Sequence, residues 1–153
     1  MLILSCSPEK QLNDEKIDGV HQLQINGSAG DYWEEGDQYL TMPFNVGSID
    51  NTKVILIADK MNKDQLINIE LIGAVVLDNN GKEETILLSI PSDQEKKVID
   101  VEDFDEFSTV YSSAKWIIEQ YLLNRSGNKK VKLKKWENET FAKNYLSKDM
   151  LAQ

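Results

Sequence analysis

The chain has 153 residues, of which 41% are hydrophobic and 28% are charged, as expected for one globular domain with its own core. Acidic residues outnumber basic ones 26 to 17, and the net charge of −9 argues against nonspecific nucleic-acid binding. A single cysteine and a single histidine exclude an intrachain disulfide framework, a Cys-rich zinc site and a two-His metal site. The sequence also has no glycine-rich phosphate loop, so any chemistry depends on carboxylates, lysines, tyrosines or a bound metal.

The N-terminus resembles a bacterial lipobox, because Ile3 and the small residue Ser5 precede Cys6, the position that would receive lipid. The following polar and acidic residues would form a tether, so we divide the chain into residues 1–18 and a folded domain at residues 19–153. The apolar run before Cys6 is shorter than the roughly 7–15 residues of a signal-peptide core, and no basic residue precedes it. Two readings follow: a longer signal precedes Met1 and the protein is lipid-anchored at the cell envelope, or this is an ordinary N-terminus of a cytoplasmic protein.

Strands dominate the sequence up to Pro91. Alternating or continuous apolar runs predict strands at residues 20–25, 38–42, 54–58, 66–77 and 85–90. Gly73 interrupts the longest run and predicts a bulge, as in a strand that bends around a barrel. Residues 78–81, Asp-Asn-Asn-Gly, predict a tight turn that joins the last two strands into a hairpin.

Helical periodicity appears only in the last third of the chain. The spacing predicts a helix over residues 109–123, with Ser108 as N-cap and Ser126-Gly127 as stop, whose apolar face carries Val110, Ala114, Ile117, Ile118, Tyr121 and Leu122. We expect Ile117 and Ile118 to pack on the sheet formed by residues 54–58 and 66–77. Asn138 is a candidate cap for a final helix that buries Phe141, Ala142, Tyr145 and Leu146.

Between these helices, lysines alternate with Val131 and Leu133 over residues 129–135. This pattern is typical of an edge strand protected by lysines, and the alternative is an anion site. The order of elements predicts an α+β fold, in which two C-terminal helices pack on a small bent sheet or OB-like barrel.

Several strings resemble family I soluble inorganic pyrophosphatases. Residues 42–52, Met-Pro-Phe-Asn-Val-Gly-Ser-Ile-Asp-Asn-Thr, resemble the family's P-x-N-Y-G-F-I-P-N-T motif, and residues 69–78 resemble its R-P-I-G-V-L-x-M-x-D strand. Residues 87–91 are similar to its I-A-V-P segment, and residues 118–136 to its amphipathic helix and the K-W-V-K-V-x-G-W strand. The order and spacing of these strings carry the resemblance, and the lipobox-like start resembles envelope-anchored members of Bacteroidetes type.

The resemblance implies Mg²⁺-dependent hydrolysis of pyrophosphate, in which clustered carboxylates hold metal ions that activate a water. Asp78 matches a metal-binding aspartate of the family, and Glu83 or Glu84 lies near a further acidic ligand. Lys82 and Tyr121 are the candidates for phosphate binding. The residues alone leave simpler roles open: Asp78 also suits a turn, and Tyr121 a helix face in the core.

The sequence departs from the family pattern where the metal site should be. The acidic loop D-G-D-P-x-D is absent after Thr52, and Lys53 stands where its last aspartate would stand. Lysine is not a ligand for a hard cation. Val46 replaces the motif tyrosine, Leu122 replaces the lysine after the matching Tyr121, and residues 22–33 contain no lysine or arginine.

We therefore expect an inorganic pyrophosphatase-like protein whose activity is weak or lost, with pyrophosphate as ligand or none, and Mg²⁺ as cofactor by resemblance. The alternative is a non-catalytic envelope lipoprotein that uses the barrel as a binding or interaction module, with membrane contact only through lipid on Cys6. A third class, nucleotide or carbohydrate binding, would use Tyr32, Trp33 and Tyr39 as stacking residues.

Overall fold

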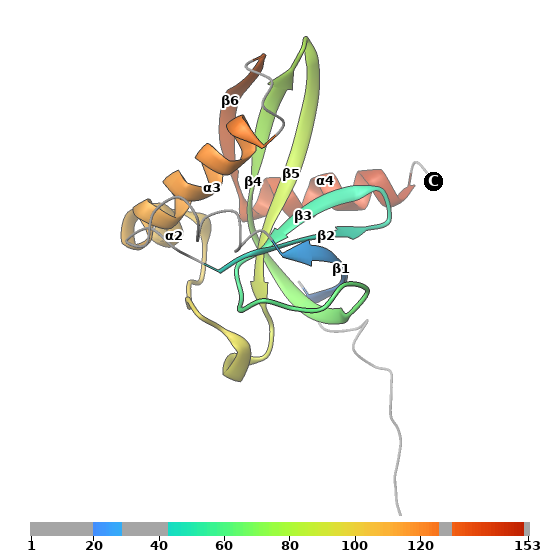
Figure 1. Ribbon diagram of the computed structural model, residues 1–153, viewed down its shortest axis with the longest axis vertical. Coiled ribbons are helices and arrows are strands. Elements are labelled where there is room, and N and C mark those ends of the chain that lie inside the picture. The colour runs from blue at the N-terminus through green and yellow to red at the C-terminus, as the bar shows by residue number, and fades with distance from the viewer. Residues whose placement is uncertain (1–19, 29–42, 126–129, 152–153) are drawn as a thin grey trace, which may run out of the picture.

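A computed structural model describes residues 20–28, 43–125 and 130–151 and shows an α+β fold (Figure 1). Cys6, the three stacking candidates and the strand expected at residues 38–42 lie outside the described residues. The elements in chain order are β1 (Val20–Ser28), β2 (Asn45–Ile49), β3 (Thr52–Leu56), β4 (Leu66–Asn79), β5 (Lys82–Pro91), the 3-10 helix η2 (Gln94–Lys96), α2 (Phe104–Val110), α3 (Ser112–Asn124), β6 (Val131–Asn138) and α4 (Glu139–Leu151).

The strands form one mixed sheet in the order β1-β2-β3-β5-β4-β6, and β1 pairs in addition with β4. The pairing of β3 with β5 is parallel, and the other pairings are antiparallel. Strand β1 pairs with the first part of β4, up to Glu70, whereas β6 pairs with the last part, from Gly73 onward. The predicted small bent sheet is therefore confirmed, and it closes in a ring of five strands without completing a barrel.

The bend of β4 lies at the predicted glycine. The register of β4 against β5 shifts between Leu71 and Gly73, which confirms the bulge. A Cβ atom at Gly73 would lie 2.6 Å from Cδ1 of Phe104 and 3.0 Å from the carbonyl oxygen of Glu137. Glycine is needed here because the first residue of α2 and the end of β6 approach the β4 backbone too closely for a side chain.

Two apolar cores lie on the two faces of the sheet. One joins Ile55 of β3, Ile57 directly after it and side chains of β4 and β5 to α2 and α3, and it includes Ile117 and Ile118 as predicted. The other fills the ring and is covered by Ala142 and Leu146 of α4. Figure 1 shows α3 and α4 on opposite sides of the sheet. Burial on both faces explains why the run from Val54 to Ala58 is continuously apolar.

The start predicted for the first helix is wrong. Ser108 lies inside α2, and the N-cap is Asp103, whose carboxylate accepts the backbone N–H of Glu106 at 2.8 Å. The helical path breaks at Tyr111, with φ −117° and ψ 44°, directly after the β-branched pair Thr109 and Val110. The described C-terminal part therefore holds three α-helices rather than two.

The last helix begins as predicted, because Oδ1 of Asn138 accepts the N–H of Phe141 at 2.9 Å. Strand β6 lies at the end of the strand order, which confirms the edge strand predicted from its lysines. Within the described ranges, no helix has both the length and the apolar character that a membrane crossing requires.

Candidate functional site

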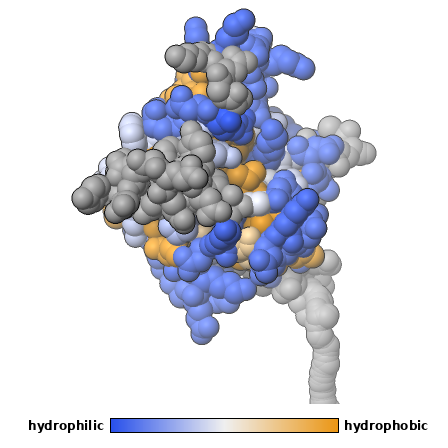
Figure 2. Space-filling model, viewed as in Figure 1, coloured by the Kyte–Doolittle hydropathy of each residue, from blue (hydrophilic) through white to orange (hydrophobic). Residues whose placement is uncertain are grey.

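The site residues suggested by the sequence gather near the projecting end of the β4–β5 hairpin, where Figure 2 shows mainly hydrophilic surface. The conformation of the hairpin turn matches the backbone preferences of its residues. Asn80 and Gly81 have φ angles of 57° and 88°, in the left-handed region that Asn and Gly adopt most readily. Oδ1 of Asp78 accepts the N–H of Gly81 at 2.7 Å, so this carboxylate stabilises the turn.

Glu84 forms the centre of a second group, which we call the Glu84 cluster: Glu84, Arg125 and Lys53. Nη2 of Arg125 donates to Oε1 of Glu84 at 2.9 Å, and Nζ of Lys53 donates to Oε2 at 3.3 Å. The side chains of Glu84 and Arg125 are 22% and 21% exposed. The three residues come from β5, the C-terminal end of α3, and β3, so the cluster joins three elements at the edge of the core.

Two opposing effects act on the pKa of Glu84. Partial burial raises it, but the charges and hydrogen bonds of Arg125 and Lys53 outweigh burial and hold the pKa below the usual value. Glu84 is therefore ionised at neutral pH, and each of its oxygens already accepts a hydrogen bond from a cation.

Glu83 faces the other way. Neighbouring residues of a strand point to opposite faces, so Glu83 and Glu84 do not converge. Glu83 pairs across the hairpin with Asp78, and its carboxylate accepts a hydrogen bond from Nζ of Lys134 at 3.1 Å. The structure thus brings Asp78 and Glu83 to one face and leaves Glu84 on the other.

This arrangement does not fit a magnesium centre, which needs carboxylate oxygens that converge and are free to bind the ion. Two of the three predicted ligands are bound to cationic side chains and the third caps a turn. Among the residues that the structure describes, no three His, Cys, Asp or Glu side chains are grouped so that they could hold a metal. Metal binding by Asp78, Glu83 and Glu84 stays a prediction.

The two candidate phosphate ligands lie near the Glu84 cluster. Lys82 is exposed at the start of β5 and, two residues from Glu84, shares its face of the strand. Tyr121 lies on α3, half-buried, and its ring meets Phe44 edge-on with centroids 5.1 Å apart. Tyr121 is thus anchored in the apolar core, while Lys82 is accessible.

The backbone near Thr52 explains why Lys53 reaches Glu84. A two-residue turn links β2 to β3, Ile49 pairs with Thr52, and Thr52 is already the first residue of β3. No acidic loop intervenes, so Lys53 lies directly beside the neighbouring strand. The departure of Lys53 from the metal-site pattern is visible in the sequence, but Arg125, the second cation that donates to Glu84 and the only arginine in the sequence, was missed.

Comparison with known proteins identifies the fold. No family model matches the chain, and no curated protein matches it in sequence. The structure is similar to an inorganic pyrophosphatase from Helicobacter pylori, with a TM-score of 0.67 and 16% identity over 94% of this chain and 98% of the other. It is also similar to a truncated vacuolar soluble pyrophosphatase of Trypanosoma cruzi in complex with PPi, with a TM-score of 0.64 and 9% identity over 92% of this chain and 72% of the other.

An inorganic pyrophosphatase from T brucei brucei is a further neighbour, with a TM-score of 0.64 and 8% identity over 92% of this chain. The chain spans about half of that protein, 54% of its length. The fold is therefore inorganic pyrophosphatase-like, and these identities carry the comparison no further than the fold.

Proposed function

We propose that this chain is a pyrophosphatase-like protein in which a cluster of ion pairs replaces metal ligands, so that Mg²⁺-dependent hydrolysis of pyrophosphate is weak or lost. The observation that carries this proposal is the pair of hydrogen bonds that Arg125 and Lys53 donate to the two oxygens of Glu84. A metal that used Glu84 would have to displace both cations.

Hydrolysis of pyrophosphate needs an activated water as the nucleophile. Metal-ion catalysis of phosphoryl transfer depends on a cation that lowers the pKa of a bound water and neutralises the substrate. Ammonium and guanidinium groups can neutralise phosphate oxygens, but they do not generate a metal-bound hydroxide. The residues at this end of the sheet are therefore suited to hold a polyanion more than to cleave it.

The cations of the site would hold pyrophosphate directly. Lys53 and Arg125 contribute two positive charges around the single carboxylate of Glu84, and Lys82 lies on the same face of β5. Charge-assisted hydrogen bonds from such groups are the common way in which proteins bind phosphate without metal. On this proposal the ligand is pyrophosphate, bound with slow turnover or none.

A phosphate-release assay with pyrophosphate and Mg²⁺ tests the proposal, with an active inorganic pyrophosphatase as positive control. Loss of the activated water removes several kcal/mol of transition-state stabilisation, so we expect turnover well below about 1 per second. Turnover of about 1–1000 per second, which is usual for enzymes, would contradict the proposal.

Anchoring at the cell envelope is a second proposal, and it rests on the sequence around Cys6. Ile3-Leu4-Ser5-Cys6 and the polar tether support a lipidated cysteine, which would make the domain an envelope-bound binding module. Fractionation of cells that express the native gene tests this. Cys6→Ala should move the protein out of the membrane fraction, whereas Ser7→Ala should not. Wild-type protein found only in the cytosol would refute the anchor.

A further inference from the structure

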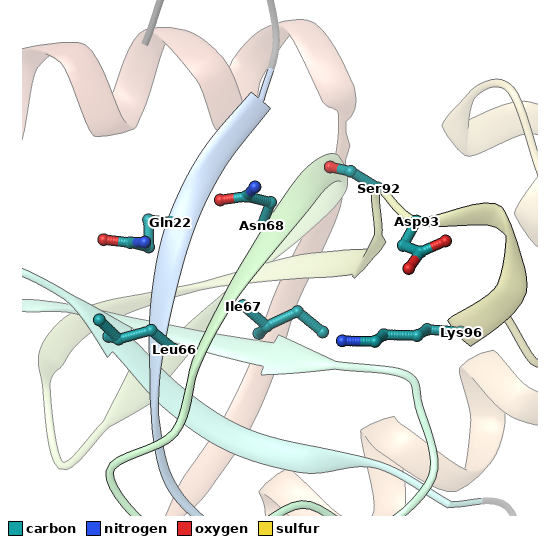
Figure 3. A pocket seen from close by; sticks show the side chains of 7 residues that line it. All are labelled: Gln22, Leu66, Ile67, Asn68, Ser92, Asp93 and Lys96. Carbon is teal, nitrogen blue, oxygen red and sulfur yellow. The ribbon is translucent and has the colours of Figure 1, made fainter. Parts of the chain in front are cut away.

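A pocket lies at the opposite end of β4 from the Glu84 cluster. It has a volume of about 420 Å³ and opens between β1, the start of β4 and the segment that carries η2 (Figure 3). This volume is within the range of small-molecule sites. Its lining combines two amides, two opposite charges and two apolar side chains: Gln22, Asn68, Asp93, Lys96, Leu66 and Ile67.

Backbone hydrogen bonds fix the charged side of the pocket. The N–H of Ser92 donates to the carbonyl of Asn68 at 3.0 Å and ties the segment to β4. Asp93 then caps η2, since its Oδ1 accepts the N–H of Glu95 at 3.0 Å, and the N–H of Lys96 donates to the carbonyl of Asp93 at 3.0 Å. Asp93 and Lys96 are therefore held in one tight turn at the pocket wall.

The two opposite charges are not neutralised by each other. The next lysine, Lys97, is paired with Asp100 at 3.3 Å and with Glu70 at 4.0 Å. By contrast, within the described part of the chain neither Asp93 nor Lys96 has an ion-pair partner. Figure 3 shows the ammonium of Lys96 extended toward Ile67, apart from the carboxylate of Asp93.

Two further features of the lining suit a ligand with polar and apolar parts. The hydroxyl of Ser92 is buried and has no hydrogen-bond partner among the described residues, a state that is costly unless a partner is supplied. Ile67 supplies the apolar part beside Lys96, whereas its neighbour in β4, Leu66, is 56% exposed and points to the opposite face of the strand. A ligand seated beside Lys96 would contact Ile67.

We propose that this pocket binds a small zwitterion of the α-amino acid class with an aliphatic side chain. The ligand carboxylate pairs with Lys96, the ligand ammonium pairs with Asp93, and the side chain packs on Ile67. A ligand with one charge would leave either Asp93 or Lys96 without a counter-charge, so both ligand charges contribute to binding. This inference is independent of the proposed function at the Glu84 cluster.

The test is a titration of isotope-labelled protein followed by backbone amide NMR shifts, with L-leucine as probe. Two analogues separate the charges: 4-methylpentanoate lacks the ammonium, and 3-methylbutylamine lacks the carboxylate. We expect saturable shifts around Ser92 and Lys96 with L-leucine and at least about tenfold weaker binding of either analogue, as for loss of one charge-assisted hydrogen bond.

Lys96→Gln and Asp93→Asn should each weaken L-leucine binding by about tenfold or more. Asn keeps the capping role at residue 93, so η2 should survive, and the dispersion of the amide spectrum checks that the variants fold. Lys143→Gln and Asp105→Asn make the same charge changes at exposed helix positions and should leave binding unchanged. Absence of saturable shifts with L-leucine, or equal binding of 4-methylpentanoate, would overturn the proposal.

Discussion

The Nδ2 of Asn45 donates to the carbonyl oxygen of Ala58 at 3.2 Å, which ties the start of β2 to the end of the segment that follows β3. The same amide donates to the carbonyl of Asp59 at 3.1 Å, and its Oδ1 accepts the N–H of Met61 at 3.0 Å. Asn45 is fully buried, so one side chain satisfies three backbone groups that turn away from the sheet.

Asn45→Ala should therefore lower the free energy of unfolding by about 2–4 kcal/mol, because it leaves buried polar groups of the backbone without partners. Urea denaturation of the wild type and the variant measures the change. Asn144→Ala, at an exposed position of α4, is the matched control and should change stability by less than about 0.5 kcal/mol. Equal effects in the two variants would contradict a structural role for the Asn45 amide.

Ile118→Ala should cost about 2–5 kcal/mol, since Ile118 is fully buried between α3 and the sheet and its loss leaves a cavity. Thermal or urea unfolding gives the value. Val110 is 62% exposed, so Val110→Ala should cost far less. A small effect of Ile118→Ala would mean that α3 packs differently on the sheet.

Stability should depend on pH through Glu84. Because its pKa is lowered in the folded state, its contribution is fully present above the unfolded value of about 4.3 and is lost as pH falls through the folded pKa. Glu84→Gln should lower stability at pH 7 by about 1–2 kcal/mol, a figure reduced for the partial exposure of the pair. The difference between wild type and variant should shrink as pH falls below about 4 in urea denaturation series.

Glu83→Gln is the control for this series. Its partner Lys134 is 49% exposed and Glu83 is 59% exposed, so this pair contributes less than about 1 kcal/mol at any pH. The Glu84 cluster would lose its assigned role if the two variants had the same pH dependence.

Magnesium should leave the melting temperature unchanged. A metal that binds the folded state raises the melting temperature by mass action, and the acidic side chains of this site already have other partners. Asp78→Ala should cost about 1 kcal/mol, the value of its turn hydrogen bond, with and without Mg²⁺. A clear rise with Mg²⁺ that disappears in Asp78→Ala would instead establish a metal site at the hairpin.

Local signals made much of the fold predictable. The turn at residues 78–81, the bulge at Gly73 and the cap at Asn138 each depend on one or two residues whose backbone preferences are strong. The closed ring was not derivable in this way, because the pairing of β1 with β4 joins segments about 45 residues apart and has no local signature. Asp103 was missed as a cap because it stands in a run of acidic residues that also suits a solvated surface.

The candidate site, like the fold, could be predicted from the sequence only in part. The sequence indicated that Lys53 stands where a metal ligand was expected, and the tight turn before Thr52 agrees with a missing loop. The role of Arg125 depends on where α3 ends relative to β5, a tertiary relationship that no spacing in the sequence encodes. The pocket beside η2 is also formed by β1, β4 and the segment after β5, which meet only when the ring closes.

The order of pairing in the ring has a consequence for how the chain folds. The β4–β5 hairpin is local, so its turn can close early at small entropic cost. Strand β1 cannot pair with β4 before the first residues of β4 have been synthesised. Strand β3 likewise pairs in parallel with β5, which follows β4 in the chain. During synthesis, at roughly 5–20 residues per second, the first three strands therefore leave the ribosome seconds before the partners that close the ring.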